Sequence, residues 1–255
     1  MRFKDRRVLL TGGSGAMGRL IARDIRKAGG QLTIVDLNPP EDGGAFIAGD
    51  LSTTIGLDLL CARVAAEPWD ILINLAGIQH FGPLEAQTPA HLNATYMVNL
   101  VAPARLAQAV LPGMKARGRG QIANVGSIFG SINFAHFATY SSSKAGLRAL
   151  SQALRRELIQ TGVGVTYVAP RAVRTPLNSD AVNAWAKLTG MTMDEPEAIA
   201  RRIVRAIRDG RKDVYLGFPE ALFVRLNGFA PGLIDGALRA NDLKARALFT
   251  PSQSH

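Results

Sequence analysis

The 255-residue sequence contains one cysteine and no long apolar run. Cys61 cannot form a disulfide within the chain, and no His or Cys lies at a metal-ligand spacing from it, so no metal site is expected. Charged residues, Gly or Pro interrupt every stretch that approaches the roughly 20 apolar residues of a membrane-spanning helix. The first ten residues lack the apolar core of a secretory signal. These absences predict a cytoplasmic chain without a spanning segment.

Negative charge is also scarce, with 20 Asp and Glu against 30 Lys and Arg, which gives a formal net charge of +10. Such an excess is typical of nucleic-acid-binding proteins. However, the densest basic cluster, at residues 201–212, has no interleaved aromatic residues and fits the solvated face of an amphipathic helix equally well. No nucleic-acid partner is therefore expected.

Short apolar runs alternate along the chain with segments of helical periodicity. The runs expected to be strands are residues 8–10, 32–35, 45–48, 71–74, 121–125 and 163–169. Such strands are typical of a parallel sheet with helices on both faces. We predict one α/β domain over residues 1–255, with a doubly wound, Rossmann-type parallel sheet. Within it we expect residues 176–194 to form an irregular lid on the substrate side and residues 218–255 an amphipathic C-terminal extension.

Three signals mark expected helix ends. Gly29 and Gly30 end the first helix, Thr88 caps a helix whose first residue is Pro89, and Gly162 closes the helix that begins near Thr139.

A glycine-rich segment, Thr-Gly-Gly-Ser-Gly-Ala-Met-Gly at residues 11–18, separates the first expected strand from the first helix. Glycines there permit a tight turn and let N–H groups at the helix start approach a pyrophosphate. Asp36, at the end of the next strand, is placed to accept hydrogen bonds from the adenosine ribose hydroxyls. The loop alone also fits an ordinary turn, but its setting indicates a dinucleotide site.

Asp36 also favours NAD over NADP. A carboxylate about 4 Å from a ribose 2′-phosphate would repel it by roughly 4 kcal/mol per unit charge at an effective dielectric constant near 20. Arg19 could lean towards such a phosphate, so NADP stays an alternative.

Tyr140 and Lys144 lie one helical turn apart, and Ser127 follows the strand 121–125. To act as a base at neutral pH, Tyr140 needs a pKa about 2–3 units below its usual value near 10. The Lys144 ammonium and the positive charge of an oxidised nicotinamide would stabilise its phenolate. Ser127, at a strand end where open α/β sheets bind ligands, could hydrogen-bond the substrate oxygen. Each residue alone fits a surface or turn position, whereas together they predict an active site.

The sequence resembles the short-chain dehydrogenase/reductase family over about residues 5–215, because these motifs recur there in the same order. The resemblance implies a catalytic tetrad of Asn99, Ser127, Tyr140 and Lys144. It also implies reversible hydride transfer between a nicotinamide and an alcohol or ketone, and a homo-oligomer, either a dimer or a tetramer. With the positions above, the expected cofactor-binding residues are Gly12, Ser14, Gly15, Met17, Gly18, Asp36, Asp50, Leu51, Asn74, Ala76, Gly77, Tyr140, Lys144, Pro170, Val173 and Thr175.

Three residues depart from the family pattern, although none removes a catalytic group. Ala16 replaces a glycine, Leu75 replaces an asparagine, and Arg171 replaces the glycine after Pro170. Arg171 could face the cofactor, the substrate or solvent.

Pro103 lies four residues after Asn99 in what looks like a single helix. Because proline has no N–H, the carbonyl of Asn99 loses its usual helical partner. In the family this carbonyl is thought to hold a water of a proton relay, and Pro103 would leave it free for that task. The alternative is a kinked helix without catalytic meaning.

Most residues that could line the substrate pocket are aromatic or apolar, which predicts an apolar substrate. They are Gln79, His80, Phe81, Phe134, His136, Phe137, Leu177, Trp185 and Leu188. The C-terminal extension could cap this pocket, join subunits or lie on a membrane, but its nearly balanced charges argue against attraction to anionic lipid. Two other functions stay open: a membrane-associated reductase of lipid-like ketones or acyl groups, and a non-catalytic dinucleotide sensor.

Overall fold

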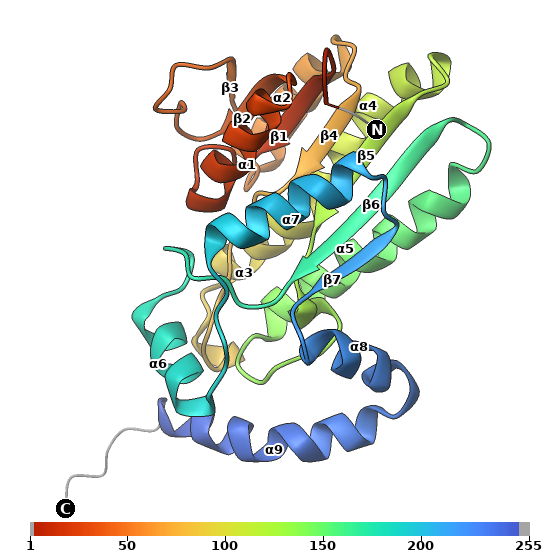
Figure 1. Ribbon diagram of the computed structural model, residues 1–255. Coiled ribbons are helices and arrows are strands. Elements are labelled where there is room, and N and C mark those ends of the chain that lie inside the picture. Colours follow the sequence, from red (N-terminus) through yellow and green to blue (C-terminus); the bar gives the residue numbers. More distant parts are fainter. Residues whose placement is uncertain (1–2, 250–255) are drawn as a thin grey trace, which may run out of the picture.

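The computed structural model describes residues 3–249, which form one parallel sheet with helices on both sides (Figure 1). The strand order is β3-β2-β1-β4-β5-β6-β7, so the direction of winding reverses between β1 and β4. The strands are β1 (Arg7–Thr11), β2 (Gln31–Asp36), β3 (Phe46–Ala48), β4 (Ile71–Asn74), β5 (Gly120–Val125), β6 (Val163–Pro170) and β7 (Asp213–Leu216). The predicted doubly wound α/β fold is confirmed.

Six strands lie within one residue of the predicted runs, and β7 was not predicted. β7 pairs only with β6 and lies at the edge of the sheet. Its four residues begin with the exposed Asp213, and only Leu216 is fully buried. Such a short, half-exposed strand lacks the continuous apolar run that marks a buried strand.

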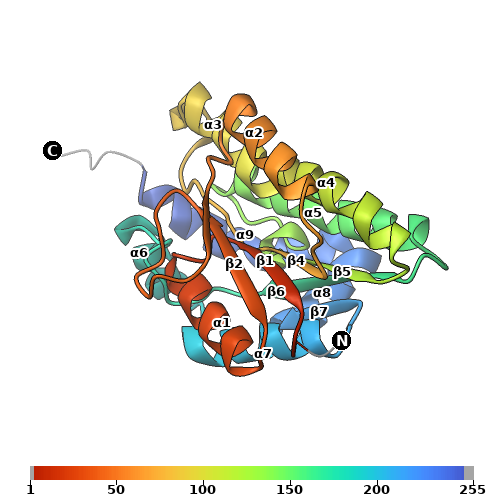
Figure 2. The same cartoon turned by 90° about the horizontal axis from the view of Figure 1, so that it is seen from above.

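Five long helices cover the two faces of the sheet. α1 (Ala16–Lys27) and α7 (Pro196–Arg208) lie on one face, and α2 (Thr54–Ala65), α4 (Ala102–Ala116) and α5 (Ala138–Glu157) lie on the other (Figure 2). Strand side chains alternate between these faces. Leu10 and Ile73 pack on the side of α1, whereas Leu9 and Leu72 pack on the side of α2 and α4.

Two of the three predicted helix ends are confirmed. Gly29 follows the end of α1 with a positive φ of 79°, and the Thr88 side chain accepts a hydrogen bond from the His91 N–H at the start of α3 (Pro89–Tyr96). The expectation for Gly162 is wrong. α5 ends at Glu157, and Gly162 instead belongs to the turn that leads into β6.

The segment expected to be irregular, residues 176–194, contains a helix, α6 (Asp180–Thr189). The Ser179 side chain caps it by accepting from the Val182 N–H, and Gly190 ends it with a positive φ of 69°. The C-terminal extension forms α8 (Glu220–Phe229) and α9 (Pro231–Ala247). All three helices lie beyond the carboxyl ends of the strands, at the bottom of Figure 1.

α3 runs into α4 through a π-helical turn, η2 (Met97–Val101), which contains Asn99. In this turn the Ala102 N–H bonds the Met97 carbonyl, one residue further away than in an α-helix. Pro103 follows in the first turn of α4, where a missing N–H is well tolerated. The expected single helix kinked at Pro103 is therefore wrong in detail, because the irregularity is the wide turn before the proline.

Candidate active site

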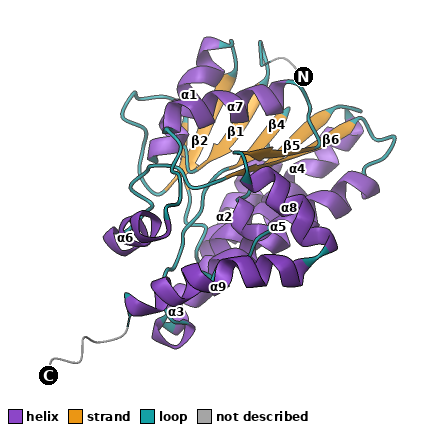
Figure 3. Ribbon diagram, turned by 60° about the horizontal axis from the view of Figure 1, so that its bottom comes forward, coloured by secondary structure: helices purple, strands orange, loops and turns teal. Residues whose placement is uncertain are grey.

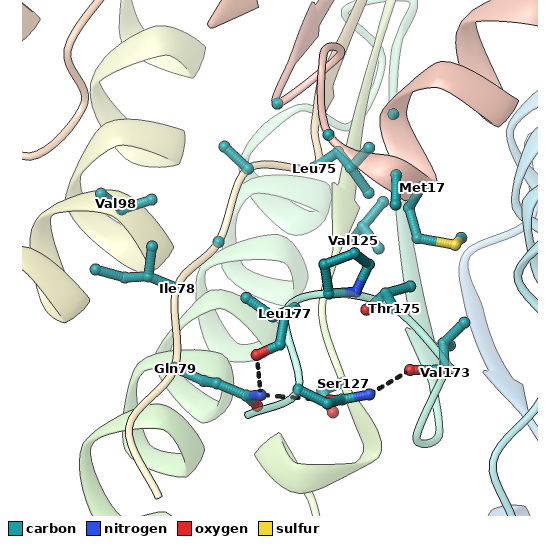
Figure 4. A pocket seen from close by; sticks show the side chains of 18 of the residues that line it. Met17, Leu75, Ile78, Gln79, Val98, Val125, Ser127, Val173, Thr175 and Leu177 are labelled. Carbon is teal, nitrogen blue, oxygen red and sulfur yellow. Dashed lines mark hydrogen bonds between the residues drawn. The ribbon is translucent and has the colours of Figure 1, made fainter. Parts of the chain in front are cut away.

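A cavity of about 800 Å³ opens at the carboxyl ends of the strands. Segments that follow β1, β2, β4, β5 and β6 line it, and Figure 4 shows several of these side chains around it. The reversal of winding between β1 and β4 places it where open α/β sheets bind ligands. Of the residues expected to bind the cofactor, all except Asn74 line this cavity.

The glycine-rich loop is shaped by close backbone approaches. Gly12 has a positive φ of 70°, and a Cβ there would lie 2.8 Å from the Cα of Ala76. A Cβ on Gly18 would lie 2.0 Å from the carbonyl oxygen of Gly12. Both contacts exclude any larger residue, so the turn needs glycine at these two positions.

The N-terminus of α1 faces the cavity without a capping side chain. Gly15 is the N-cap residue, and the first turn contains no acidic residue. The first N–H groups of a helix lack intrahelical partners and carry partial positive charge. This end of the cavity is therefore suited to a phosphate group.

Asp36 is held beside the glycine-rich loop by two backbone N–H groups. Its carboxylate accepts from the Ser14 N–H at 3.0 Å and from the Leu37 N–H at 2.8 Å. Arg19, which could approach a ribose phosphate, instead pairs with Glu41 at 2.8 Å. The structure therefore places a fixed carboxylate, and a cation already paired with an acid, at this end of the cavity.

Asp50 and Leu51 follow β3 at the same end of the cavity. Hydrogen bonds from the Ser52 hydroxyl and N–H hold the pKa of Asp50 below its usual value. Leu51 is buried against the core on the α2 side.

Asn74 supports the cavity from within the sheet. It is buried, and its amide donates to Asn124 at 2.8 Å, which in turn donates to Ser151 in α5 at 2.8 Å. The next residue, Leu75, packs its side chain against the core on the α1 side. The leucine that stands in place of the family's asparagine therefore lies in an apolar environment.

Tyr140 and Lys144 lie in the first two turns of α5, and both are buried. The Lys144 Nζ donates to the Val125 carbonyl at 3.2 Å and lies 5.8 Å from the centre of the Tyr140 ring. A Cβ on Gly77 would lie 3.3 Å from this Nζ, so a glycine leaves room for the lysine. Ser127 Oγ accepts from the Phe129 N–H at 3.2 Å, and its hydroxyl lies near enough to Tyr140 to lower the pKa of that phenol.

Burial shifts the pKa values of both titratable groups towards their neutral forms. It raises the pKa of Tyr140, an effect that the hydrogen bond from Ser127 partly offsets. It lowers the pKa of Lys144 to about 8. The sequence argument assigned a lowered pKa of Tyr140 to Lys144 and an oxidised nicotinamide acting together. In the protein alone the pKa is raised instead, because the cost of burying the phenolate outweighs the effect of Ser127.

Asn99 does not line the cavity, and its side chain connects two walls of the site. Its Oδ1 accepts from the Ile78 N–H at 2.9 Å, and its Nδ2 donates to the Ile78 carbonyl at 2.8 Å and to Ser143 Oγ at 3.0 Å. Because Ile78 follows β4 and Ser143 precedes Lys144, Asn99 fixes the loop after β4 against α5.

Comparison with known proteins identifies the family to which this site belongs. The family model for short chain dehydrogenases matches residues 6–185. The chain belongs to the short-chain dehydrogenase/reductase family. It is 34% identical to the ketoacyl reductase HetN of Nostoc sp. over 81% of this chain and 77% of that protein. It is 30% identical to dehydrogenase/reductase SDR family member 7B of Bos taurus over 94% of this chain and 82% of that protein.

Solved structures agree with this family assignment. A short-chain dehydrogenase from Streptomyces avermitilis is 27% identical, with a TM-score of 0.76 over 95% of this chain and 98% of that one. A short-chain dehydrogenase from Sphingobium yanoikuyae in complex with NADPH is 26% identical, with a TM-score of 0.75 over 90% of this chain and 95% of that one. This short-chain dehydrogenase/reductase is an NAD(P)-dependent oxidoreductase that acts on CH–OH or C=O groups.

Pro170, Val173 and Thr175 of this dehydrogenase/reductase line the cavity after β6, and Arg171 explains how that loop is held. Arg171 contacts Asp194 through two hydrogen bonds of 2.9 and 2.7 Å and pairs with Glu220 at 3.0 Å. Sequence alone left the direction of Arg171 open. The structure shows that its guanidinium joins the loop after β6 to the end of the 176–194 segment and to the start of α8.

Four of the nine residues expected on the substrate side of the dehydrogenase/reductase line the cavity: Gln79, Phe137, Leu177 and Trp185. The other five were misplaced: His80, Phe81, Phe134, His136 and Leu188 do not line it. Phe81 and Phe134 lie in the aromatic layer behind the cavity wall, and Leu188 is exposed. Gln79 donates to the Leu177 carbonyl at 2.7 Å and so joins the loop after β4 to the 176–194 segment (Figure 4).

Among the lining residues that sequence reasoning missed are Ile78, Phe129, Val182 and Met193. Phe129 could have been found, because it follows Ser127 by two residues in the loop after β5. Val182 and Met193 could not, because their places depend on how the segment with α6 folds back over the cavity.

α8 and α9 form an outer wall of the site. Val224, Ile234 and Ala245 belong to the same buried cluster as Tyr140 and Trp185. The Asn227 amide of α8 also donates to the Ser131 carbonyl, in the loop after β5, at 2.7 Å.

Within residues 3–249, no group of three or more His, Cys, Asp or Glu is placed to hold a metal ion. Over the same range, no helix has both the length and the apolar content needed to cross a membrane.

Proposed function

We propose that this enzyme interconverts an apolar secondary alcohol and its ketone, with Tyr140 as the acid and base, Ser127 orienting the substrate oxygen and NAD as the preferred cofactor. The observation that carries this proposal is the meeting of Ser127, Tyr140 and Lys144 at one cavity, with the Ser127 side chain beside Tyr140.

The opposite end of the same cavity fits a dinucleotide. The uncapped N-terminus of α1 and the turn through Gly12 and Gly18 would hold the pyrophosphate, and Asp36 would bind the adenosine ribose. By family resemblance, Thr175 would contact the nicotinamide carboxamide. When bound, the cofactor supplies or accepts the hydride.

Tyr140 would exchange the proton that accompanies the hydride. In the reductive direction its hydroxyl donates to the carbonyl oxygen, and in the oxidative direction its phenolate takes the proton from the alcohol. The Ser127 hydroxyl lies beside it, where it can donate to the same oxygen. Orientation by two groups keeps the reacting carbon in one position relative to the cofactor site.

Lys144 would stabilise the Tyr140 phenolate. With a pKa of about 8, Lys144 is mostly protonated at neutral pH, and its ammonium lies close to the Tyr140 ring. Burial opposes ionisation of Tyr140, so this charge and that of an oxidised nicotinamide together would have to lower the pKa of Tyr140.

Asn99 would be the fourth member of the catalytic group and would act through its backbone. Its side chain holds Ile78 and Ser143, which leaves the carbonyl in the π-helical turn as the group able to bind a relay water. Pro103, which lacks an N–H, supports this role.

The preference for NAD rests on Asp36. Its carboxylate is fixed by two N–H groups and would repel a 2′-phosphate, while Arg19 is occupied by Glu41. NADP stays the alternative if Arg19 leaves Glu41.

The substrate side of the cavity supports an apolar substrate. Its lining includes Ile78, Phe129, Leu177, Trp185 and Met193. A lipid-like ketone is the second candidate, because α8 and α9 add further apolar surface outside the cavity. The intact Ser127, Tyr140 and Lys144 argue against a purely dinucleotide-sensing protein.

A substrate panel tests the proposal. Aliphatic, cyclic and lipid-like secondary alcohols and ketones, with polar sugars as a comparison, would be assayed with NAD, NADP, NADH and NADPH. We expect turnover with apolar members and a higher kcat/KM with NAD(H). Cofactor binding without turnover of any member would favour the sensor. Turnover confined to sugars would contradict the apolar assignment, and turnover confined to NADP(H) would contradict the cofactor preference.

A further inference from the structure

α8 and α9 carry an unusual amount of exposed apolar surface. Among the residues that the structure describes, fifteen large hydrophobic side chains are exposed, and eight of them lie between residues 218 and 248. We call these eight the C-terminal apolar surface: Phe218, Leu222, Phe223, Leu226, Phe229, Leu233, Leu243 and Leu248. Scattered exposed hydrophobic residues are ordinary, but such a concentration marks an interaction surface.

Both helices divide into an inward and an outward side. On α8, Leu222, Leu226 and Phe229 follow the helical repeat and are exposed, and Phe229 is 90% exposed. On α9, Ile234 and Ala245 are buried in the cluster that contains Tyr140. Figure 1 shows α9 along the outer edge of the molecule, and Figure 3 shows α8 and α9 together outside the sheet. The inward sides therefore complete the site, while no other part of residues 3–249 covers the outward apolar side chains.

The charges on this surface are more positive than the sequence count suggests. Glu220 is turned inward and pairs with Arg171, and Asp242 is partly buried against the backbone of Ala135. Arg225 and Arg239 are exposed, as is Lys244, whereas Asp235 is the exposed acid of α9. Among the exposed charged residues of α8 and α9, cations therefore outnumber acids, although the sequence count is nearly balanced.

We propose that the C-terminal apolar surface docks this enzyme onto an anionic lipid bilayer. An amphipathic helix with apolar side chains flanked by Lys and Arg lies in the bilayer interface, where the apolar face is buried and the cations contact lipid headgroups. A second copy fits less well. In a two-fold contact between these surfaces, the exposed Arg225, Arg239 and Lys244 of each copy would meet one exposed acid of α9, Asp235, in a chain whose net charge is +10.

Docking in this way would bring the substrate side of the cavity to the lipid. α8 and α9 share a buried cluster with Phe137 and Trp185, which line the cavity. A lipid-like ketone could then pass from the bilayer to the cavity. This step rests on the proposed function, whereas docking itself does not.

The test is co-sedimentation with vesicles of phosphatidylglycerol and, separately, of phosphatidylcholine, without substrate or cofactor. Phe229→Ser combined with Leu233→Ser removes two exposed apolar side chains. The matched control combines Ile55→Ser with Leu59→Ser, two similarly exposed side chains four residues apart on α2. Thermal unfolding and NADH binding of each variant would show that it is folded.

We expect the unmodified protein to bind phosphatidylglycerol vesicles, more weakly at high salt, and to bind phosphatidylcholine much less. The Phe229/Leu233 variant should lose at least about tenfold in vesicle affinity, and the α2 control should keep it. No vesicle binding by the unmodified protein, or equal binding by all variants, overturns docking. If this variant instead turns a dimer into monomers in sedimentation velocity and no form binds vesicles, the surface is a contact between copies. Vesicle binding with no turnover of any ketone would leave docking intact and refute the proposed function.

Discussion

The guanidinium of Arg171 and the carboxylate of Asp194 face each other through two parallel hydrogen bonds, from Nε at 2.9 Å and from Nη2 at 2.7 Å. The two side chains are mostly buried, and the Glu220 carboxylate pairs with the same guanidinium through its Nη1. Gly217, with a φ of 121°, gives the arginine room, since a Cβ there would lie 2.6 Å from Arg171 Cδ. Three segments far apart in sequence therefore meet at one side chain.

Replacement of Arg171 by Met should lower the free energy of unfolding by about 2 kcal/mol, because it leaves two mostly buried carboxylates unpaired. Arg174→Met is the matched control in the same loop. Arg174 pairs with Glu195 at a well-exposed site, so its loss should change stability by less than about 0.5 kcal/mol. Urea unfolding measures the free energy of unfolding of both variants. Equal changes for Arg171→Met and Arg174→Met would show that the Arg171 network adds no stability.

Tyr140→Phe removes the hydroxyl proposed to exchange the proton. Turnover should fall at least about 10²-fold, while NADH affinity stays nearly unchanged. Tyr96→Phe is the control, because the Tyr96 hydroxyl contacts Ser142 and does not line the cavity. Steady-state kinetics and NADH titration of both variants decide the matter, and near-normal turnover by Tyr140→Phe would refute the role of Tyr140.

Lys144 should make stability rise with pH between about 8 and 10. Burial lowers its pKa to about 8 in the folded protein from 10.5, so over this window the unfolded chain binds more protons than the folded one. Raising the pH removes this difference and favours the folded state. Between pH 7.5 and 10, the unmodified protein should gain about 2 kcal/mol relative to Lys144→Met, which cannot titrate. Parallel curves of unfolding free energy against pH would contradict the lowered pKa.

Asp36→Ala should narrow the preference for NADH over NADPH by at least about tenfold in the ratio of dissociation constants, because it removes a fixed negative charge. Asp42→Ala serves as a control, since Asp42 is exposed and pairs with Arg26. Fluorescence titration gives both constants. Tighter binding of NADPH than NADH by the unmodified protein would overturn the preference itself.

Pro103→Ala supplies an N–H that could bond the Asn99 carbonyl and displace a relay water. We expect NADH affinity to persist and turnover to fall, with a changed dependence on pH. Pro112→Ala, at the other proline of α4, should leave the pH profile unchanged. Superimposable profiles for all three proteins would mean that Pro103 is only structural.

The sequence alone predicted the features that depend on local spacing. Six strands, the glycine turn at residues 11–18 and the single helical turn between Tyr140 and Lys144 follow from neighbours along the chain. Backbone geometry makes such relations independent of the remaining fold. β7 and α6 escaped prediction for different reasons. β7 follows the charged residues Arg211 and Lys212 and itself begins with Asp213, so it lacks the apolar start of a strand pattern, whereas the sequence marks α6 by its cap residues Ser179 and Gly190.

Only the tertiary structure decided which distant groups meet. It paired Arg171 with Asp194 and Glu220, raised the pKa of Tyr140 through burial, and placed Phe81 and Phe134 behind the cavity wall. It also turned two acids of the C-terminal extension inward and left its apolar side chains exposed. Whether a side chain is buried, and whether its charge is paired, depends on which element packs against it. Helical periodicity in the sequence shows which side of a helix is apolar but not which element covers that side.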